Sequence, residues 1–513
     1  MGVAKVILNG TTLMDVTNKT VSESNLLYGE TALKNDGTAI TGTLSYIIPS
    51  GTLPINSDGI YDVESYASVD VSVGGGGLTI DDLAMKTIAG AISGNASYIA
   101  SEAFRAYDTI TAASFSLCET INSAAFSSCT GLTTVSFPVC TSIADYGFYR
   151  CTSLPTVSFS VCSYIGISAF AYCSDLSTVS FPSCTYIGSS AFNNCSSLQF
   201  ASFPNCTSIG ASAFNSCINL STASFPKITS FPSYAFAYCS NLVDIYAPSC
   251  TYIAGYAFMS CNVLTTASFP NCSYIGVSAF QRCWSLSNIS FPSCTTIGTY
   301  AFQYCDILPY AIFPSCTSLG QAAFNACYAL SIASFQLLTS IGLSAFAACS
   351  SLTTVSFPAC TTIGAYAFNY CSSLSVVSLS AVTTIQSNAF SMCSNLQSVS
   401  FRSCTVVSQN AFVMCSRLST VVLPECTTIG SSAFRSCYML LSLYLFASRV
   451  PTISAPFPST PIAGYTTSTG GVYGSVYVRS TIYSSIIANT TWKTYSSRIV
   501  SMTDEEIEAF LGS

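Results

Sequence analysis

The segment CTYIGSSAFNNCSSLQFASFP, residues 184–204, is one copy of a motif that fills most of the chain. The Ala-Phe pair within it, which ends at Phe192, sets a register that recurs every 22 residues, sixteen times, without insertion or deletion. One copy, at Gly147, has Gly in place of the Ala. A repeat this regular predicts a solenoid, because each copy can bury its apolar side chains only against the copies beside it.

The two halves of the motif predict different structures. Residues 132–138, LTTVSFP, alternate like the strand of a leucine-rich repeat, and Cys140 stands where such repeats place Cys or Asn. In the other half, Gly188 and the serines after it fit a turn and the N-cap of a short helical turn that points Phe192 inward. We therefore expect a leucine-rich-repeat solenoid of sixteen 22-residue repeats, with a parallel β-sheet on one side and short helical turns on the other. Both halves also share one spacing of Cys, Ile or Leu, and Phe, which leaves a flattened two-sided β-solenoid as the alternative.

The string F-P-x-C-T-x-I-G-x-x-A-F-x-x-C-x-x-L, which recurs from about residue 96 to 445, resembles the BspA-like leucine-rich repeat family. This resemblance implies a bacterial surface protein with a role in adhesion or binding. Residues 446–513 resemble the C-terminal cap that follows such repeats. There we expect a strand at Val476–Val478, a helix near Thr481–Asn489 and a short acidic helix beginning at Thr503.

All 27 cysteines fall into two columns, a column being the set of residues at one position of the repeat. One column follows the Ala-Phe pair and the other is the ladder position of Cys140. Where a column lacks Cys, its occupant is Ile228, Leu338, Val382 or Tyr107. Because aliphatic residues replace Cys, and because no C-x-x-C occurs, we expect buried free thiols rather than disulfides or metal ligands. Free thiols indicate folding in a reducing compartment.

Charge and composition exclude several classes of function. The chain has no His, and the repeats between residues 109 and 445 carry six acidic and six basic residues. A neutral array attracts neither nucleic acid nor an anionic membrane. Without His, paired carboxylates or a phosphate-binding motif, we expect no enzyme activity, no cofactor and no metal. We also expect no membrane insertion, since no run of about 18 apolar residues occurs.

The remaining sequence divides into an N-terminal attachment region at residues 1–73 and a linker and capping segment at 74–95. Asn35-Asp36-Gly37 and Asp58-Gly59 predict turns between short strands. Residues 28–44 and 51–73 resemble short modules of phage and prophage tail-fibre proteins, which implies attachment to other tail proteins. Residues 78–94 suit a short helix that caps the first coil.

Exposed aromatic residues among Ser and Thr are typical of adaptable recognition surfaces. Outward strand columns are mostly Ser or Thr, with large exceptions. Tyrosine pairs flank three of the repeat phenylalanines and would share one face of a helical turn. One site brings a cation and an indole together. The candidate recognition surface comprises Tyr234, Tyr238, Tyr300, Tyr304, Tyr366, Tyr370, Tyr246, Tyr310, Phe200, Arg282 and Trp284.

These observations favour a non-enzymatic protein of a phage or prophage tail, resembling a tail fibre, whose repeats bind a glycan or protein of the bacterial surface. It would assemble in the host cytoplasm, because the N-terminus lacks the pattern of a secretory signal. The alternatives are a cellular BspA-like surface adhesin and an inert spacer. The sequence leaves the formation of a homo-oligomer open, since no coiled-coil heptads occur.

Overall fold

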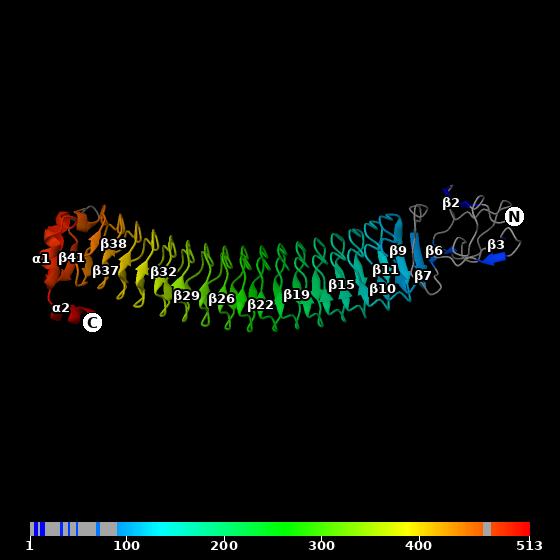
Figure 1. Cartoon of the computed structure of the whole chain (residues 1–513), viewed down its shortest axis with the longest axis horizontal. Helices are drawn as coiled ribbons and strands as arrows, with labels where there is room; N and C mark the ends of the chain where they lie inside the picture. Colours follow the sequence, from blue (N-terminus) through cyan, green and yellow to red (C-terminus); the bar gives the residue numbers. More distant parts are fainter. Residues whose placement is uncertain are drawn as a thin grey trace. The chain divides into compact units, whose positions relative to one another are not determined.

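The computed structural model describes residues 90–464 and 473–512, together with the backbone of six short strands before residue 90. The chain forms two units, Met1–Ser249 and Cys250–Ser513. Within each unit, coils of 22 residues stack side by side with their strands parallel (Figure 1). The predicted leucine-rich-repeat solenoid is confirmed.

Most coils contribute a three-residue strand to a main parallel sheet, in which residues 22 apart are register partners, as Thr156 is with Thr178. Within the two units, strand pairing is interrupted before β13, β17, β27 and β33. Pro155 and Pro309, which lack a backbone N–H donor, precede β13 and β27. In the first unit the strands are β7 (Gly90–Gly94), β9 (Ile110–Phe115), β11 (Thr134–Ser136), β13 (Thr156–Ser158), β15 (Thr178–Ser180), β17 (Phe200–Ser202), β19 (Thr222–Ser224) and β21 (Asp244–Tyr246). In the second unit they are β23 (Thr266–Ser268), β25 (Asn288–Ser290), β27 (Tyr310–Ile312), β29 (Ile332–Ser334), β31 (Thr354–Ser356), β33 (Val376–Ser378), β35 (Ser398–Ser400), β37 (Thr420–Val422), β39 (Ser442–Leu445), β41 (Ser475–Arg479) and β42 (Ile499–Met502).

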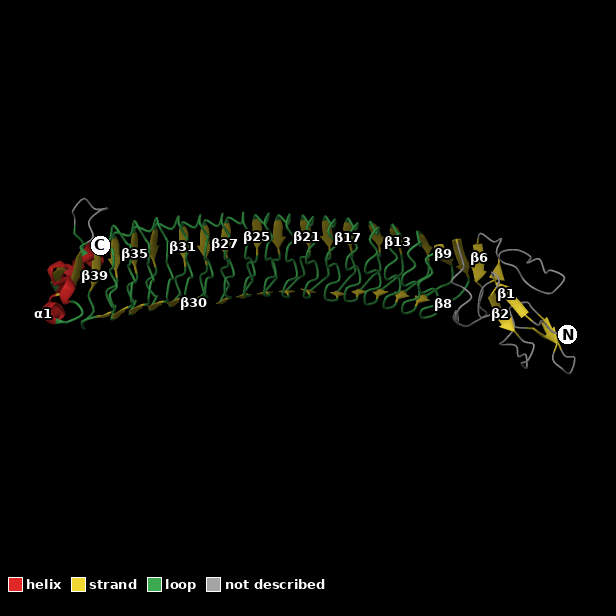
Figure 2. Ribbon diagram, turned by 90° about the horizontal axis from the view of Figure 1, so that it is seen from above, coloured by secondary structure: helices red, strands yellow, loops and turns green. Residues whose placement is uncertain are grey.

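A second parallel sheet runs along the other side of the coils, built from two-residue strands (Figure 2). Each pairs an inward Ile, Leu, Val or Phe with its counterpart in the next coil, as in Ile165 with Ile187. The first unit contains β8 (Tyr98–Ile99), β10 (Thr120–Ile121), β12 (Ser142–Ile143), β14 (Tyr164–Ile165), β16 (Tyr186–Ile187), β18 (Ser208–Ile209) and β20 (Ser230–Phe231). The second contains β22 (Tyr252–Ile253), β24 (Tyr274–Ile275), β26 (Thr296–Ile297), β28 (Ser318–Leu319), β30 (Ser340–Ile341), β32 (Thr362–Ile363), β34 (Thr384–Ile385), β36 (Val406–Val407), β38 (Thr428–Ile429) and β40 (Thr452–Ile453).

The segment around the Ala-Phe pair is turned but not helical, so the helical detail of the prediction is wrong. Its backbone N–H groups alternate between two kinds of acceptor. In the coil of Phe126, the N–H of Ser127 donates to the carbonyl three residues back, at 3.0 Å, whereas that of Phe126 donates to Gly147 of the next coil, at 2.8 Å. The residues two before and two after the Phe, here Ala124 and Ser128, have φ of 54° and 64°. Left-handed backbone costs about 1–2 kcal/mol per residue, and the hydrogen bonds between coils offset that cost.

The core is formed by two columns of stacked phenylalanines. Phe126 and Phe148 of consecutive coils lie parallel with ring centroids 5.2 Å apart, and Phe115 and Phe137 do the same at 5.6 Å. Phe137 meets Phe148 edge to face. These rings are fully buried, so every coil binds its neighbours through apolar contact as well as backbone hydrogen bonds.

The glycine before the Ala-Phe pair has a different role from the predicted one. Gly188 has no positive φ. A Cβ placed there would lie 2.5 Å from the carbonyl carbon of Gly166 in the preceding coil. This column therefore favours Gly because two coils approach closely, not because the chain must turn.

The N-terminal region contains β1 (Lys5–Leu8), β2 (Thr11–Asp15), β3 (Thr31–Leu33), β4 (Ala39–Thr41), β5 (Ile48–Pro49) and β6 (Ser68–Val71). β3 and β4 pair antiparallel, which confirms the hairpin predicted around Asn35-Asp36-Gly37. The turn predicted at Asp58-Gly59 lies outside the described residues. Of the predicted capping helix, the described part is instead β7, which pairs with β6 and β9. The first coil is thus covered by added strands.

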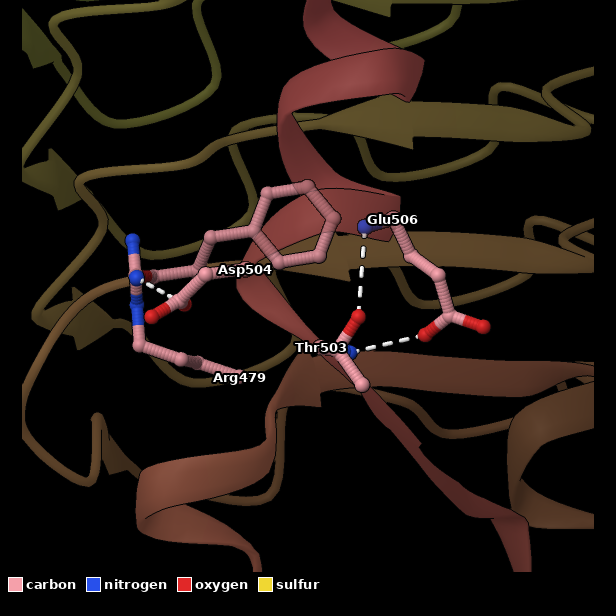
Figure 3. A network of polar contacts seen from close by, with 5 residues as sticks. Arg479, Thr503, Asp504 and Glu506 are labelled. Carbon is pink, nitrogen blue, oxygen red and sulfur yellow. Dashed lines mark hydrogen bonds and ion pairs between the residues drawn. The ribbon is translucent and has the colours of Figure 1, made fainter.

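The C-terminal cap extends the main sheet by β41 and β42 and adds η3 (Pro461–Ala463), α1 (Ser480–Ala488), η4 (Lys493–Arg498) and α2 (Asp504–Gly512). α2 begins with a reciprocal cap (Figure 3). The N–H of Thr503 donates to Glu506 Oε2 at 2.7 Å, and the N–H of Glu506 donates to Thr503 Oγ1 at 3.3 Å. Arg479 pairs with Asp504 and ties the helix to β41. The cap therefore closes the end of the stack much as predicted.

Candidate recognition surfaces

Many hydroxyl groups of the array are bound within it. The Thr or Ser after the ladder Cys donates its hydroxyl to a carbonyl 22 residues earlier. Thr185 Oγ1, for example, donates to Ser163 O at 3.1 Å. A second ladder runs beside the main sheet, where Thr133 Oγ1 donates to Thr111 O at 2.9 Å. These side chains hold coils together, which leaves the residues outside the ladders as candidates for binding.

The cysteines belong to the core. All 27 are buried, as predicted, and none forms a disulfide. Cys195 Sγ donates to Phe170 O at 3.1 Å, and Cys184 Sγ donates to Tyr186 O at 3.3 Å. Burial raises the pKa of the Cys129 thiol to about 12, so its reactive thiolate is suppressed. In the described part of the chain, no cluster of acidic residues and cysteines has the arrangement of a metal site.

Three of the predicted residues lie on the outer face of the main sheet. Phe200 on β17 and Tyr246 on β21 are exposed in the first unit, and Tyr310 on β27 is exposed in the second. Each replaces the Thr or Ser that most coils have at its position. The inward residue at the centre of each of these strands stays buried. The three predicted side chains face solvent without supporting the fold.

The predicted tyrosine pairs lie on the turn segments. Their arrangement there differs from the one that the sequence predicts. Tyr234 and Tyr238 are both exposed, but they take the two left-handed positions of the coil, with φ of 59° and 61°, rather than one face of a helix. Tyr366 and Tyr370 are exposed in the same way, whereas Tyr300 and Tyr304 are half-buried. Gln321 Nε2 donates to the Tyr300 hydroxyl at 3.3 Å.

A further set of tyrosines covers the second sheet. Tyr164 stacks on Tyr186 with centroids 5.1 Å apart, and Tyr252 stacks on Tyr274 at 4.7 Å. Each pair joins consecutive coils, which supports a structural role for these four residues.

Arg282 and Trp284 are both exposed, yet within the described residues the guanidinium does not lie over the indole ring. The reason for predicting a joint hot spot is therefore absent. Trp284 instead belongs to a larger set that the sequence analysis missed.

That set, the aromatic patch, gathers exposed residues from three consecutive coils of the second unit. Tyr310 is the register partner of Ile332, and Trp284 and Tyr328 occupy equivalent positions two coils apart. The members of the patch and their exposed fractions are Trp284 (47%), Ile307 (50%), Tyr310 (51%), Ile312 (56%) and Tyr328 (46%). Exposed apolar side chains grouped on consecutive coils in this way mark candidate interaction sites. Only comparison of several columns over adjacent coils could have identified it.

The first unit has a smaller group, the tyrosine–arginine cluster, formed by Tyr146, Tyr149, Arg150 and Tyr172. Tyr149 meets Tyr146 and Tyr172 edge to face, each with centroids 5.6 Å apart. The Arg150 guanidinium lies 5.4 Å from the Tyr149 ring and 5.6 Å from that of Tyr172. It combines three columns of two adjacent coils and was also missed. No helix among the described residues is long and apolar enough to cross a membrane.

Stacked 22-residue coils with a parallel sheet and inward Leu, Phe and Cys columns define a leucine-rich-repeat protein. The chain belongs to the family of the BspA type leucine rich repeat region, whose model matches residues 97–221, 207–331 and 317–441.

Several solved structures are similar. A leucine-rich repeat protein from Bacteroides ovatus is 18% identical, with a TM-score of 0.41 over 80% of this chain and 98% of its own. A leucine rich cell surface protein from Faecalibacterium prausnitzii is 23% identical, with a TM-score of 0.36 over 65% and 94%. The pneumococcal vaccine antigen PcpA is 17% identical, with a TM-score of 0.40 over 78% and 99%. No curated protein matches the sequence.

Proposed function

We propose that the protein is a non-enzymatic adhesion protein whose repeats bind a component of the bacterial surface through the aromatic patch. The carrying observation is that Trp284, Tyr310 and Tyr328 are exposed together on adjacent coils of one unit. Trp and Tyr are the residues that most often dominate binding energy at interfaces. Trp284, Tyr310, Ile312 and Tyr328 occupy columns that are Ser or Thr in most other coils, so the fold does not require them. An inert spacer has no need of such a group.

The patch carries few charges: Asp306 is the one charged residue between its members, and Arg282 stands beside Trp284. Binding there should rely on apolar contact and hydrogen bonds, and should change little with salt. A neutral glycan or a protein surface fits this chemistry better than a polyanion does.

For the attachment of the protein we propose a phage or prophage tail, through residues 1–73. Two observations support this choice over a cellular surface adhesin. The N-terminal segments resemble tail-fibre modules. The 27 free thiols stand in columns through consecutive coils, and folding in an oxidising compartment would expose them to wrong pairing. Assembly in a reducing host cytoplasm avoids that hazard.

The test is cell binding by a patch variant, with Trp284→Ser, Tyr310→Thr, Ile312→Ser and Tyr328→Ser. Each new residue already occurs in the same column of other coils. With about 2 kcal/mol or more for each aromatic anchor, the labelled variant should bind a panel of gut bacteria at least ten-fold more weakly than the parent. The matched control, Val376→Thr with Met414→Ser, removes two exposed apolar side chains of the same unit outside the patch.

Circular dichroism should be native for both proteins. If the patch variant binds like the parent and the control, the patch is not the recognition site. An equal loss of cell binding in both variants would also reject the patch as the recognition site. Binding would then depend on exposed apolar area in general.

A further inference from the structure

The tyrosine–arginine cluster of the first unit has chemistry that the aromatic patch lacks. Tyr146, Arg150 and Tyr172 are exposed, and Tyr149 is half-buried between the two outer tyrosine rings. One cation therefore stands among three aromatic rings on two adjacent coils. The array as a whole is neutral and sparsely charged.

The backbone holds these residues in place before any ligand arrives. Tyr146, Arg150 and Tyr172 take left-handed positions with φ of 60°, 58° and 62°. Their N–H groups donate to carbonyls of the next coil, at 2.8 Å from Tyr146, 2.9 Å from Arg150 and 2.8 Å from Tyr172. A site fixed in this way loses little conformational entropy on binding.

The charge of Arg150 is not neutralised within the described residues. Its guanidinium lies near the rings of Tyr149 and Tyr172 and forms no ion pair there. The carboxylate of Asp145, in the same coil, accepts elsewhere: its Oδ1 receives a hydrogen bond from the Ile167 N–H at 2.7 Å. A planar guanidinium has five N–H donors and binds carboxylates in a bidentate manner.

We propose that the tyrosine–arginine cluster binds an acidic saccharide, a pyranose that carries a carboxylate. Arg150 pairs with the carboxylate, and the negative faces of the tyrosine rings receive the C–H groups of the sugar. The inference rests on the proposed role of the array in recognition and assigns a class of ligand to a second surface.

Two other anionic ligands fit less well. An acidic peptide strand would need free main-chain groups to pair with, but the N–H groups of Tyr146, Arg150 and Tyr172 are already engaged between coils. Phosphate groups are typically bound by several arginines, and this cluster has one.

The test is titration of the full-length protein with trigalacturonic acid and, separately, with its methyl ester, which has the same rings without the charge. We expect saturable binding of the acid and at least ten-fold weaker binding of the ester. Arg150→Asn should weaken binding of the acid at least ten-fold and leave binding of the ester unchanged. Tyr172→Ser should weaken the binding of both ligands. Asn194 and Ser216 occupy the same column, so both variants should fold. Arg435→Gln, which removes an exposed arginine outside the cluster, should bind like the parent.

Equal affinity for acid and ester, or unchanged binding by a folded Arg150→Asn protein, overturns the proposal. Tighter binding of an acidic peptide or of inorganic phosphate than of the saccharide also overturns it. These titrations involve no cells and no patch residue. Failure of the aromatic patch to bind bacteria would therefore leave their outcome unaffected, and the two proposals can fail separately.

Discussion

Raising the pH above about 9 should unfold the array, because its buried thiols ionise more readily in the unfolded chain. Burial raises the pKa of the Cys129 and Cys173 thiols to about 12, against about 8.5 for a thiol exposed to water. The neutral thiol is the form that the fold accepts. The stability due to such a group is fully present below the unfolded pKa and is lost as the pH rises toward the folded one.

The magnitude follows from the number of buried thiols. At about pH 9.5, one unit above the unfolded pKa, each thiol that stays protonated in the fold lowers the free energy of unfolding by about 1.4 kcal/mol. About ten of them would offset the 5–15 kcal/mol by which a typical domain is stable. Burial raises the pKa of 22 of the 27 buried thiols of the array. We therefore expect unfolding between about pH 9 and pH 10.5.

Circular dichroism under a reducing agent would follow the fold, and thiol labelling at each pH would follow exposure. Both should change together and reverse on return to neutral pH. Replacing Cys162, Cys184 and Cys206 by Val removes three of these thiols and should move the transition to higher pH. A fold that persists at about pH 11, or thiols that react without loss of structure, would contradict the reasoning.

Three further outcomes are expected. Replacing Cys173, Cys195 and Cys217 by Val should lower the free energy of unfolding in urea more than replacing Cys162, Cys184 and Cys206 by Val. The expected difference is about 1–3 kcal/mol per site. The first column has no aliphatic precedent, whereas the second already contains Ile228, Leu338 and Val382; equal losses would contradict this. Deletion of residues 1–73 should leave circular dichroism native, since β7 still pairs with β9, and a collapsed spectrum would show that the region is needed for folding. Thr503→Ala should cost about 1 kcal/mol and speed hydrogen exchange in α2 while the array stays protected; unchanged exchange in α2 would argue against the cap.

The strand columns and the core could be predicted because burial and strand alternation repeat in every copy. Leu132, Phe137 and Cys140 face inward as their spacing requires. The structure of the turn segment could not be predicted, because its Ala-Phe-x-x-Cys spacing also fits a helical turn. What decides against a helix is the hydrogen bond from each Phe N–H to the next coil, and such contacts override local preference.

The candidate surfaces were predicted only in part, for a related reason. Reading one column at a time identified Tyr310 and Trp284 as exceptions. It also identified Ile312 as an exception in its own column. It did not identify Ile307, which lies in the coil of Tyr310, or Tyr328, which lies two coils from Trp284 in the same column. Tyr444 on β39 stands in the same outward column as Tyr246, but a second element covers it. Phe510 of α2 stacks on it with centroids 4.2 Å apart.

Hydroxyl-radical footprinting of the full-length protein, free and bound to bacteria that it recognises, tests the central claim most directly. Oxidation is read by mass spectrometry, side chain by side chain. The account predicts that Trp284, Tyr310 and Tyr328 become protected on binding, while Val376 and Met414 are oxidised equally in both states. Protection confined to the C-terminal cap, or no protection anywhere in the repeats of a bound protein, would contradict it and leave the array as a spacer.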